Sequence, residues 1–299
     1  MKTYFEELEI NAKKVKEVLT AKGIDEKYLQ FGGEGVKPDK QPRVPTDARS
    51  EFLANRAMGD WAENILAKAI NQTEGQYDAI HYGDSDSMSA GEPGFKDFYL
   101  NRLEDVRIHG KRPDLLLTLN DNKSPKDVSK SDTKKLEKLV KNSVAAIEVR
   151  SSKYEALTYM RVRKEQSATG KLSARQTPSF TVKVEDLIIV YRWIESFGCP
   201  QVYCQVFFDS VFVINVLRIF EIIGKEDNWR IEKPEKSQLK STIMIPITEG
   251  IQVGKFSKLP SFKAKEKITY LGRHDAYVVP KGGSLELNFE KLLTILTQK

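Results

Sequence analysis

Two acidic residues lie inside strongly apolar stretches in the middle of the chain. Asp114 precedes the leucine run at residues 115–117, and Glu148 is flanked by isoleucine and valine. A buried carboxylate is costly unless a cation or hydrogen-bond donors compensate its charge. Two such carboxylates that can approach one another therefore indicate a bound divalent metal ion.

The spacing of the two acids fits a pair of neighbouring strands. Residues 113–119 and 144–150 both have the composition of buried strands, and residues 120–142 connect them. An antiparallel pairing that places Asp114 opposite Glu148 uses both predicted strands in full. Directly opposed Cβ atoms lie about 5 Å apart, so both carboxylates can reach one small cation.

A third charged side chain would share this face of the strand pair. Side chains two apart on a strand point to the same side, so Arg150 joins Glu148 while Ile147 and Val149 point into the core. Carboxylate ligands suit Mg²⁺ or Mn²⁺ better than Zn²⁺. Such an ion can acidify a bound water and stabilise charge on a phosphate. The residues therefore predict a metal-activated water that attacks a phosphodiester.

The order Pro113-Asp114 followed by Glu148-Val149-Arg150 resembles the PD-(D/E)xK motif of the restriction-endonuclease-like superfamily. The similarity covers roughly residues 48–216 and is closest to a prokaryotic type II restriction endonuclease. It implies an α/β fold, with a central mixed β-sheet flanked by helices. It also implies sequence-specific, Mg²⁺-dependent cleavage of double-stranded DNA in the cytoplasm, with Mn²⁺ as a possible substitute. Such an enzyme implies a cognate DNA methyltransferase in its host.

The chain departs from this family at one position of the motif, where lysine is usual and Arg150 stands. Arginine keeps its proton at working pH, so Arg150 can act electrostatically but not as a base. Lys153 is an alternative cation, although it needs a bend in the chain to reach the same face. The resemblance also implies a metal-binding glutamate on the first core helix. Glu63 fits that role as well as it fits a solvated helix face.

The basic balance of the chain, with a formal charge of +6 and a pI near 9.0, favours a polyanionic partner. A dense basic segment follows the predicted metal-binding strand, and lysine and arginine there would supply affinity for phosphates. The loop at 167–177 is a candidate for reading base edges, with an ordinary solvated loop as the alternative. Residues 272–275 are a weaker candidate. The predicted DNA-binding residues are Arg56, Lys153, Tyr159, Arg161, Arg163, Lys164, Lys171, Arg175 and Gln176.

The remaining elements follow from apolar periodicity and from glycine and proline positions. Residues 1–47 are expected to form an N-terminal helical extension and linker. Residues 48–299 are expected to form the nuclease domain, with a core at about 48–223 and C-terminal α+β additions at 224–299. The expected helices are 4–20, 48–71, 153–166, 186–197, 217–223 and 287–296. The lysine-rich stretch that ends at residue 142 is either a solvated excursion or contains a short helix at about 133–140. The other expected strands are 202–208, 211–216, 242–247 and 268–271, and residues 72–100 are expected to be irregular.

Several other classes of protein are disfavoured. The three histidines are scattered, so nothing supports a Ser-His-Asp apparatus. Cys199 and Cys204 lack partners for a zinc site and are expected to be reduced. No apolar stretch reaches the roughly 18 residues needed to span a membrane. The N-terminus lacks the apolar region of a signal peptide, which favours a cytosolic protein.

The sequence leaves two alternative functions open. One is a repair or recombination nuclease that recognises DNA structure. The other is a non-catalytic DNA-binding protein with structural acids, which Arg150 in place of lysine keeps plausible. An enzyme that reads a short palindrome would be a two-fold homodimer, with each subunit cutting one strand.

Overall fold

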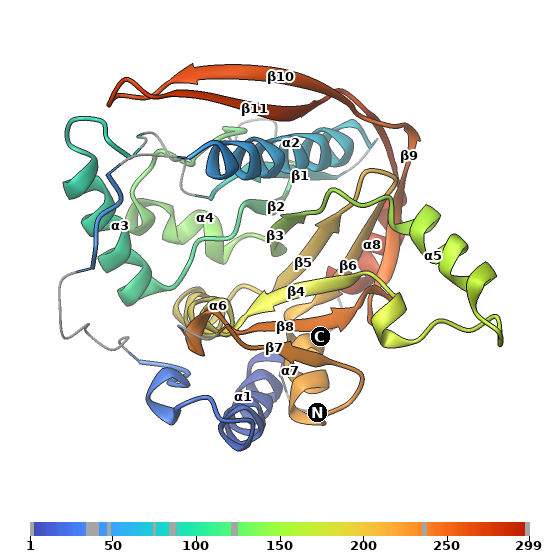
Figure 1. Ribbon diagram of the computed structural model, residues 1–299. Coiled ribbons are helices and arrows are strands. Elements are labelled where there is room, and N and C mark those ends of the chain that lie inside the picture. The colour runs from blue at the N-terminus through green and yellow to red at the C-terminus, as the bar shows by residue number, and fades with distance from the viewer. Residues whose placement is uncertain are drawn as a thin grey trace.

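The computed structural model describes residues 3–33, 42–46, 49–73, 76–83, 88, 90–120, 125–234 and 238–296. Its centre is a seven-stranded mixed sheet (Figure 1) with the order β1-β2-β3-β5-β6-β9-β12. β3 and β5 pair in parallel, and the other neighbours pair antiparallel. The strands are β1 (Tyr77–His81), β2 (Leu115–Leu119), β3 (Ala145–Ser151), β5 (Gln201–Val206), β6 (Ser210–Asn215), β9 (Ile251–Lys258) and β12 (Ser284–Leu287).

Helices cover both faces of this sheet, which confirms the predicted α/β architecture. Successive strand residues point to opposite faces, so Ala146 and Tyr203 join one apolar cluster while Ile147 and Val202 join the other. The first cluster is completed by α1 (Tyr4–Ala21), α6 (Val184–Phe197) and α7 (Val216–Gly224). The second is completed by α2 (Ser50–Gln72) and α8 (Phe289–Leu296). Burial on both faces explains why β3 and β5 read as nearly continuous apolar runs.

Smaller elements surround this core. A second sheet has the order β4-β8-β7, and β10 and β11 form a long hairpin that lies over α2 (Figure 1). Helix α5 projects from the side of the molecule in the same view. These elements are α3 (Phe95–His109), β4 (Ser179–Lys183), α4 (Glu137–Lys141), α5 (Ala156–Gln166), β7 (Arg230–Glu232), β8 (Thr242–Pro246), β10 (Ser261–Ile268) and β11 (His274–Lys281).

The strand pairing predicted around the two acids is confirmed. Leu115 lies opposite Ile147, and Leu117 lies opposite Ala145. One step further along this register, Asp114 faces Glu148. The strands therefore hold the two acids as neighbours, as the sequence predicts.

The expected irregular segment at 72–100 is partly wrong, because it contains β1 and the start of α3. β1 is an edge strand of five residues that pairs only with β2 in the main sheet. α3 has no buried residue, so it lacks the apolar stripe by which a surface helix is recognised.

The predicted strand at 268–271 is also wrong, because β10 ends at Ile268 and the chain turns there. Thr269 donates its N–H to the Arg273 carbonyl at 2.8 Å, and Gly272 takes a φ of +80°. Glycine adopts this left-handed conformation at little cost. The apolar residues of this segment are therefore exposed at the tip of a hairpin.

The N-terminal helix belongs to the packed body. Leu8, Val15 and Leu19 are buried on α1, and α1 packs against α7. Residues 34–41 and 47 of the expected linker lie outside the described residues. The domain boundary near residue 47 stays a prediction.

Both cysteines are buried and free, as expected. Within the described ranges, no helix combines the length and the apolar character needed to cross a bilayer.

Candidate active site

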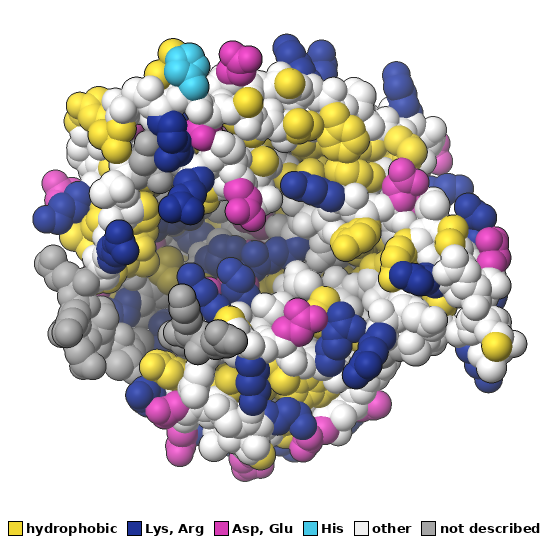
Figure 2. Space-filling model, in the orientation of Figure 1, with side chains coloured by type: hydrophobic (Ala, Val, Ile, Leu, Met, Phe, Trp, Pro, Cys, Tyr) yellow, Lys and Arg dark blue, Asp and Glu magenta, His cyan; other side chains and the backbone are white. Residues whose placement is uncertain are grey.

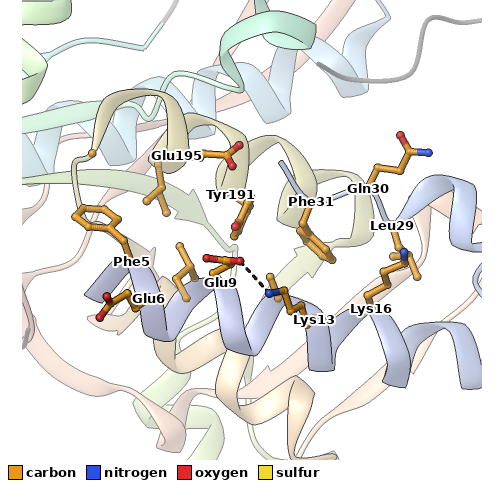
Figure 3. Close-up of a pocket in the computed structure, with 14 residues that line it drawn as sticks. Phe5, Glu6, Glu9, Lys13, Lys16, Leu29, Gln30, Phe31, Tyr191 and Glu195 are labelled. Carbon is orange, nitrogen blue, oxygen red and sulfur yellow. Dashed lines mark hydrogen bonds and ion pairs between the residues drawn. The ribbon is translucent and has the colours of Figure 1, made fainter. Parts of the chain in front are cut away.

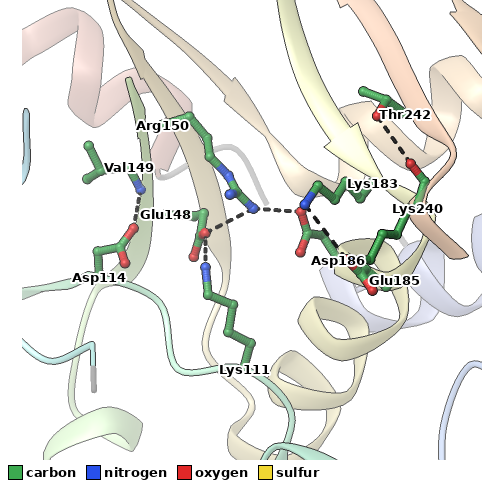
Figure 4. A network of polar contacts seen from close by, with 10 residues as sticks. All are labelled: Lys111, Asp114, Glu148, Val149, Arg150, Lys183, Glu185, Asp186, Lys240 and Thr242. Atoms are coloured by element: carbon green, nitrogen blue, oxygen red, sulfur yellow. Dashed lines mark hydrogen bonds and ion pairs between the residues drawn. The ribbon is translucent and has the colours of Figure 1, made fainter. Parts of the chain in front are cut away.

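The two acids of the motif are fixed by the β2–β3 pair. Asp114 immediately precedes β2, and its Oδ2 accepts a hydrogen bond of 2.6 Å from the backbone N–H of Val149 (Figure 4). Glu148 lies in the middle of β3, and its side chain is only 1% exposed. The Asp114 carboxylate therefore bridges the two strands beside the Glu148 carboxylate.

A glycine after β1 makes room for Asp114. The N–H groups of Tyr82 and Gly83 donate to the Asp114 carbonyl at 2.9 and 3.0 Å. A Cβ atom at Gly83 would lie 3.0 Å from the Asp114 Cα and 3.3 Å from its Oδ1. Because the first of these neighbours is backbone, any side chain at this position would displace Asp114.

We expect Gly83→Ala to lower the rate of DNA cleavage by about tenfold, since a shift of the Asp114 carboxylate weakens the alignment of the site. The check is a cleavage time course with thermal unfolding measured in parallel. Gly224→Ala is the matched control, because a Cβ there also meets a neighbour at 3.0 Å, the Cβ of Lys14, but Gly224 does not line the cavity. Full activity of Gly83→Ala would contradict the proposed placement of Asp114.

Two cations contact Glu148. The Nζ of Lys111 contacts Glu148 Oε1, and Arg150 Nη2 lies 3.3 Å from the same oxygen (Figure 4). Arg150 Nη2 also lies 2.7 Å from Oδ2 of Asp186, which is buried near the start of α6. Arg150 is therefore held between the sheet and α6, whereas Lys111 approaches from the segment that precedes β2.

Lys111 also lines a cavity, together with Asp114 and Glu63. The cavity has a volume of about 570 Å³. Among the residues that the structure describes, neither Arg150 nor Lys153 lines it. Of the two cations that contact Glu148, Lys111 is therefore the one that reaches this cavity.

The electrostatics of the cavity favour an added cation. Burial, followed by the charges of Asp114 and Asp60, raises the pKa of Glu63 to about 8. Burial and the charge of Glu148 raise the pKa of Asp114 to about 6. Both shifts mark carboxylates with too little positive charge nearby. Burial alone would lower the pKa of Lys111, but the charges of Glu148, Asp114 and Asp186 together outweigh burial, and the pKa lies above its usual value.

The acids fit a hard divalent metal ion. Oε2 of Glu148 is buried and has no hydrogen-bond partner among the described residues. Mg²⁺ needs only one or two protein carboxylates because it retains several waters. In the described part of the chain, no group of three or more His, Cys, Asp or Glu side chains is placed to hold a metal ion. A metal site here would therefore take Asp114 and Glu148 as its two protein ligands, and Glu63 lines the cavity beside Asp114.

The predicted DNA-binding residues fall into two groups. Arg56 lines the cavity with Glu63 and Asp114. The others lie beyond β3, on α5 and on the loop that follows it. Arg161 pairs with Glu165 at 3.1 Å, and Arg163 lies over the ring of Tyr159 at 5.2 Å. The exposed basic residues of this group are Lys153, Arg161, Arg163, Lys164, Lys171 and Arg175.

Gln176 is used within its own turn, where its Oε1 accepts a hydrogen bond from the Ser173 N–H at 3.0 Å. The structure therefore gives Gln176 a local structural role. Direct contact between Gln176 and DNA stays a prediction.

Sequence reasoning missed Lys111 and Asp186. Lys111 stands three residues before Asp114, and nothing in its surroundings marked it apart from other lysines. Asp186 carried a usable signal, because it is an acid at the start of the strongly apolar helix α6. A buried acid of that kind calls for a cationic partner, and Arg150 provides it.

A cavity of about 980 Å³ lies elsewhere, between α1 and α6 (Figure 3). Its wall carries an ion pair of 2.9 Å between Glu9 and Lys13, together with Phe5 and Phe31. None of the predicted site residues lines it. It is therefore not the candidate active site.

The fold and the paired acids together define a nuclease of the restriction-endonuclease-like class. A family model, the AccI restriction endonuclease, matches residues 21–173 and 156–299. These matches span most of the sequence, so the chain belongs to the AccI restriction endonuclease family.

Among solved structures, the chain is similar to D212, a nuclease from a fusselovirus, with 12% sequence identity and a TM-score of 0.31. That similarity covers 67% of this chain and 86% of the viral protein. The search of curated proteins found no match.

Proposed function

We propose that this protein is a Mg²⁺-dependent endonuclease that cleaves double-stranded DNA at a specific sequence, as a type II restriction enzyme. The observation that carries the proposal is the β2–β3 register, which sets Asp114 beside Glu148 and leaves Oε2 of Glu148 without a partner. Membership of the AccI restriction endonuclease family supports the same reaction.

Each residue of the site has a proposed role. Asp114 and Glu148 hold Mg²⁺, or Mn²⁺ in its place, and Glu63 approaches from α2 across the cavity. The ion, when bound, supplies an acidified water and charge stabilisation at the phosphate. Lys111 places its ammonium group beside Glu148 and the cavity, where it can bind a phosphate oxygen and neutralise developing charge.

Arg150 acts on the reaction through Glu148. It lies between the carboxylates of Glu148 and Asp186, and this arrangement fixes the rotamer of Glu148. These two carboxylates raise the pKa of Arg150 further, against the opposing effect of burial, so it stays charged. Arg150 is thus a positioning residue that keeps Glu148 aimed at the metal.

We expect Asp186→Asn to slow DNA cleavage by about tenfold and to weaken Mn²⁺ binding, in the range found for residues that orient metal ligands. Without Asp186, Arg150 has only Glu148 as an anionic partner and neutralises it more fully. The check is a Mn²⁺ titration beside a cleavage assay. If Asp186→Asn binds Mn²⁺ and cuts DNA as the unmodified protein does, Arg150 does not position Glu148.

The DNA is proposed to lie along the face shown in Figure 2. That face is hollowed near its centre, and lysine and arginine side chains gather in and around the hollow. The exposed basic residues of α5 and its following loop extend this surface and would contact phosphates. Recognition of a palindrome would require a homodimer. The host, proposed to be a prokaryote with the enzyme in its cytoplasm, would need a cognate DNA methyltransferase.

The test is digestion of plasmid and linear phage DNA with Mg²⁺, with Mn²⁺ and with a chelator, followed by sequencing of the fragment ends. A restriction enzyme yields discrete bands with one shared end sequence, and the chelator prevents cutting. Cutting restricted to flaps or junctions would indicate a structure-specific repair nuclease instead. Salt-dependent binding with no cleavage under either metal would indicate a non-catalytic DNA-binding protein.

A further inference from the structure

A third cavity, smaller than the two described above, lies beside the strand that carries Glu148 and Arg150. It has a volume of about 220 Å³ and is bounded by the end of β3, the start of α5, β4 and β5. Tyr154, Tyr159 and Arg175 contribute to its lining, and Gln205 of β5 reaches it from the sheet. None of these four residues has a role in the metal site described above.

Gln205 gives this cavity an unused hydrogen-bond acceptor. Its side chain is only 3% exposed, and its Oε1 is buried with no partner among the described residues. A buried amide oxygen without a donor destabilises a protein. A ligand that enters the cavity with an N–H group would satisfy this oxygen.

The walls of the cavity suit a flat aromatic ligand attached to a phosphate chain. Tyr154 is 60% exposed. Its ring meets that of Tyr159 edge to face, with the centroids 6.1 Å apart. Aromatic side chains of this kind stack on nucleobases. Arg175 and Arg230 add positive charge to the same lining, where they can contact phosphates.

The cavity lies within a few nucleotides of the proposed scissile phosphate. Gln205 is the strand partner of Arg150, and Ser151 of the lining directly follows Arg150 on β3. Three residues of strand separate Glu148 from Ser151, a distance of about 10 Å. About three nucleotides span that distance along one DNA strand.

We propose that this cavity binds one nucleobase of the DNA substrate outside the base stack and that Gln205 accepts a hydrogen bond from it. A stacked base presents only its groove edges, which cannot reach a glutamine that is 3% exposed at the base of a cavity. A base rotated out of the helix can enter, stack on the tyrosines and donate to Gln205. The inference rests on the proposed function, and it adds a second route of sequence recognition to the basic loop.

The experiment uses the recognition sequence obtained from the plasmid digest. Duplexes carry 2-aminopurine at one position at a time, up to about four nucleotides on either side of the cut. They are mixed with the full-length Glu148→Gln protein, which is expected to bind without cutting. 2-Aminopurine is quenched within the stack, so one position should show a severalfold rise in fluorescence on binding. No rise at any position, for a protein that does cut plasmid DNA, would overturn the proposal.

Three further variants, each made in the Glu148→Gln protein, distinguish binding of the base by Gln205 from a general effect of the substitutions on protein packing. Gln205→Leu should abolish the rise and weaken cognate binding by about tenfold, while binding to unrelated DNA stays the same. Tyr159→Ala should reduce the rise as well. Because Tyr159 is only partly buried in the lining of the cavity, its replacement should disturb the packing of the core little. Gln201→Leu removes another buried, unpartnered amide from β5, away from the cavity, and should leave the rise intact.

An equal loss of the fluorescence rise in Gln205→Leu and Gln201→Leu would overturn the role of Gln205. A rise that persists in both Gln205→Leu and Tyr159→Ala would place the extruded base elsewhere and would also overturn it. A protein that does not cut plasmid DNA at all contradicts the proposed function itself. That outcome is distinct from cutting without a fluorescence change.

Discussion

Replacing Glu148 with glutamine is expected to lower the rate of DNA cleavage by about a thousandfold or more. Glutamine keeps the shape of the side chain but removes the negative charge that would hold the metal ion. Loss of several kcal/mol of transition-state stabilisation corresponds to this factor, at about 1.4 kcal/mol for each tenfold. The measurement is a single-turnover cleavage assay at saturating Mg²⁺, with DNA binding measured in parallel by a gel-shift assay.

Binding of DNA by Glu148→Gln should be kept or strengthened, since a negative charge near the phosphates is lost. Glu137→Gln is a matched control, because Glu137 is exposed and forms an ion pair with Lys141 within α4. It should cut normally. Undiminished cleavage by Glu148→Gln would exclude this residue as a metal ligand.

Replacing Lys111 with methionine is expected to slow DNA cleavage by about a hundredfold without weakening metal binding. The ammonium group contacts Glu148 and lines the cavity with Asp114, so its loss removes a positive charge from the transition state. The same loss frees an oxygen of Glu148, so affinity for Mn²⁺ should stay the same or rise. Cleavage kinetics and a Mn²⁺ titration on one protein preparation measure both effects.

A lower cleavage rate with unchanged or higher Mn²⁺ affinity distinguishes Lys111 from a lysine with a purely structural role. Lys141→Met removes an exposed lysine of α4 and should change neither quantity. The comparison with Arg150→Met decides which cation serves the reaction. Normal cleavage by Lys111→Met, together with inactive Arg150→Met, would return the role of active-site cation to Arg150.

The core of the site could be predicted because its information is local to two strands. Asp114 and Glu148 stand in apolar runs of suitable length, and the register that places the two acids opposite one another also pairs both runs in full. The pairing of Leu115 with Ile147 follows that register. Helix α2 was equally predictable, since Met58, Ala62 and Ala69 recur at helical spacing and are buried.

The cations of the site could not be predicted in the same way. The contact of Lys111 with Glu148 depends on how the segment before β2 crosses the sheet, and no periodic pattern specifies that path. Arg150 was expected to serve the phosphate, and that role stays a prediction. The position of α6 also brings Asp186 within 2.7 Å of Arg150, a contact that the sequence did not indicate. Long charged side chains choose partners through tertiary packing, which a strand pattern does not contain.

The edges of the sheet were predicted less well for a related reason. β1 and β12 are short strands at opposite edges of the sheet, and each pairs with a single neighbouring strand of that sheet. Strands of this kind carry few apolar residues in an alternating pattern. Their place follows from pairing with β2 and β9, so the sequence alone gives little sign of them.

The central claim is that Asp114 and Glu148 together form one metal site. Binding of Mn²⁺, followed by electron paramagnetic resonance, tests it most directly, with the unmodified protein compared with Asp114→Asn, Glu148→Gln and the double variant. We predict that each single change weakens binding at least about tenfold and that the double change adds little, because both ligands serve the same ion. Binding by Asp114→Asn and Glu148→Gln that equals that of the unmodified protein would contradict the account.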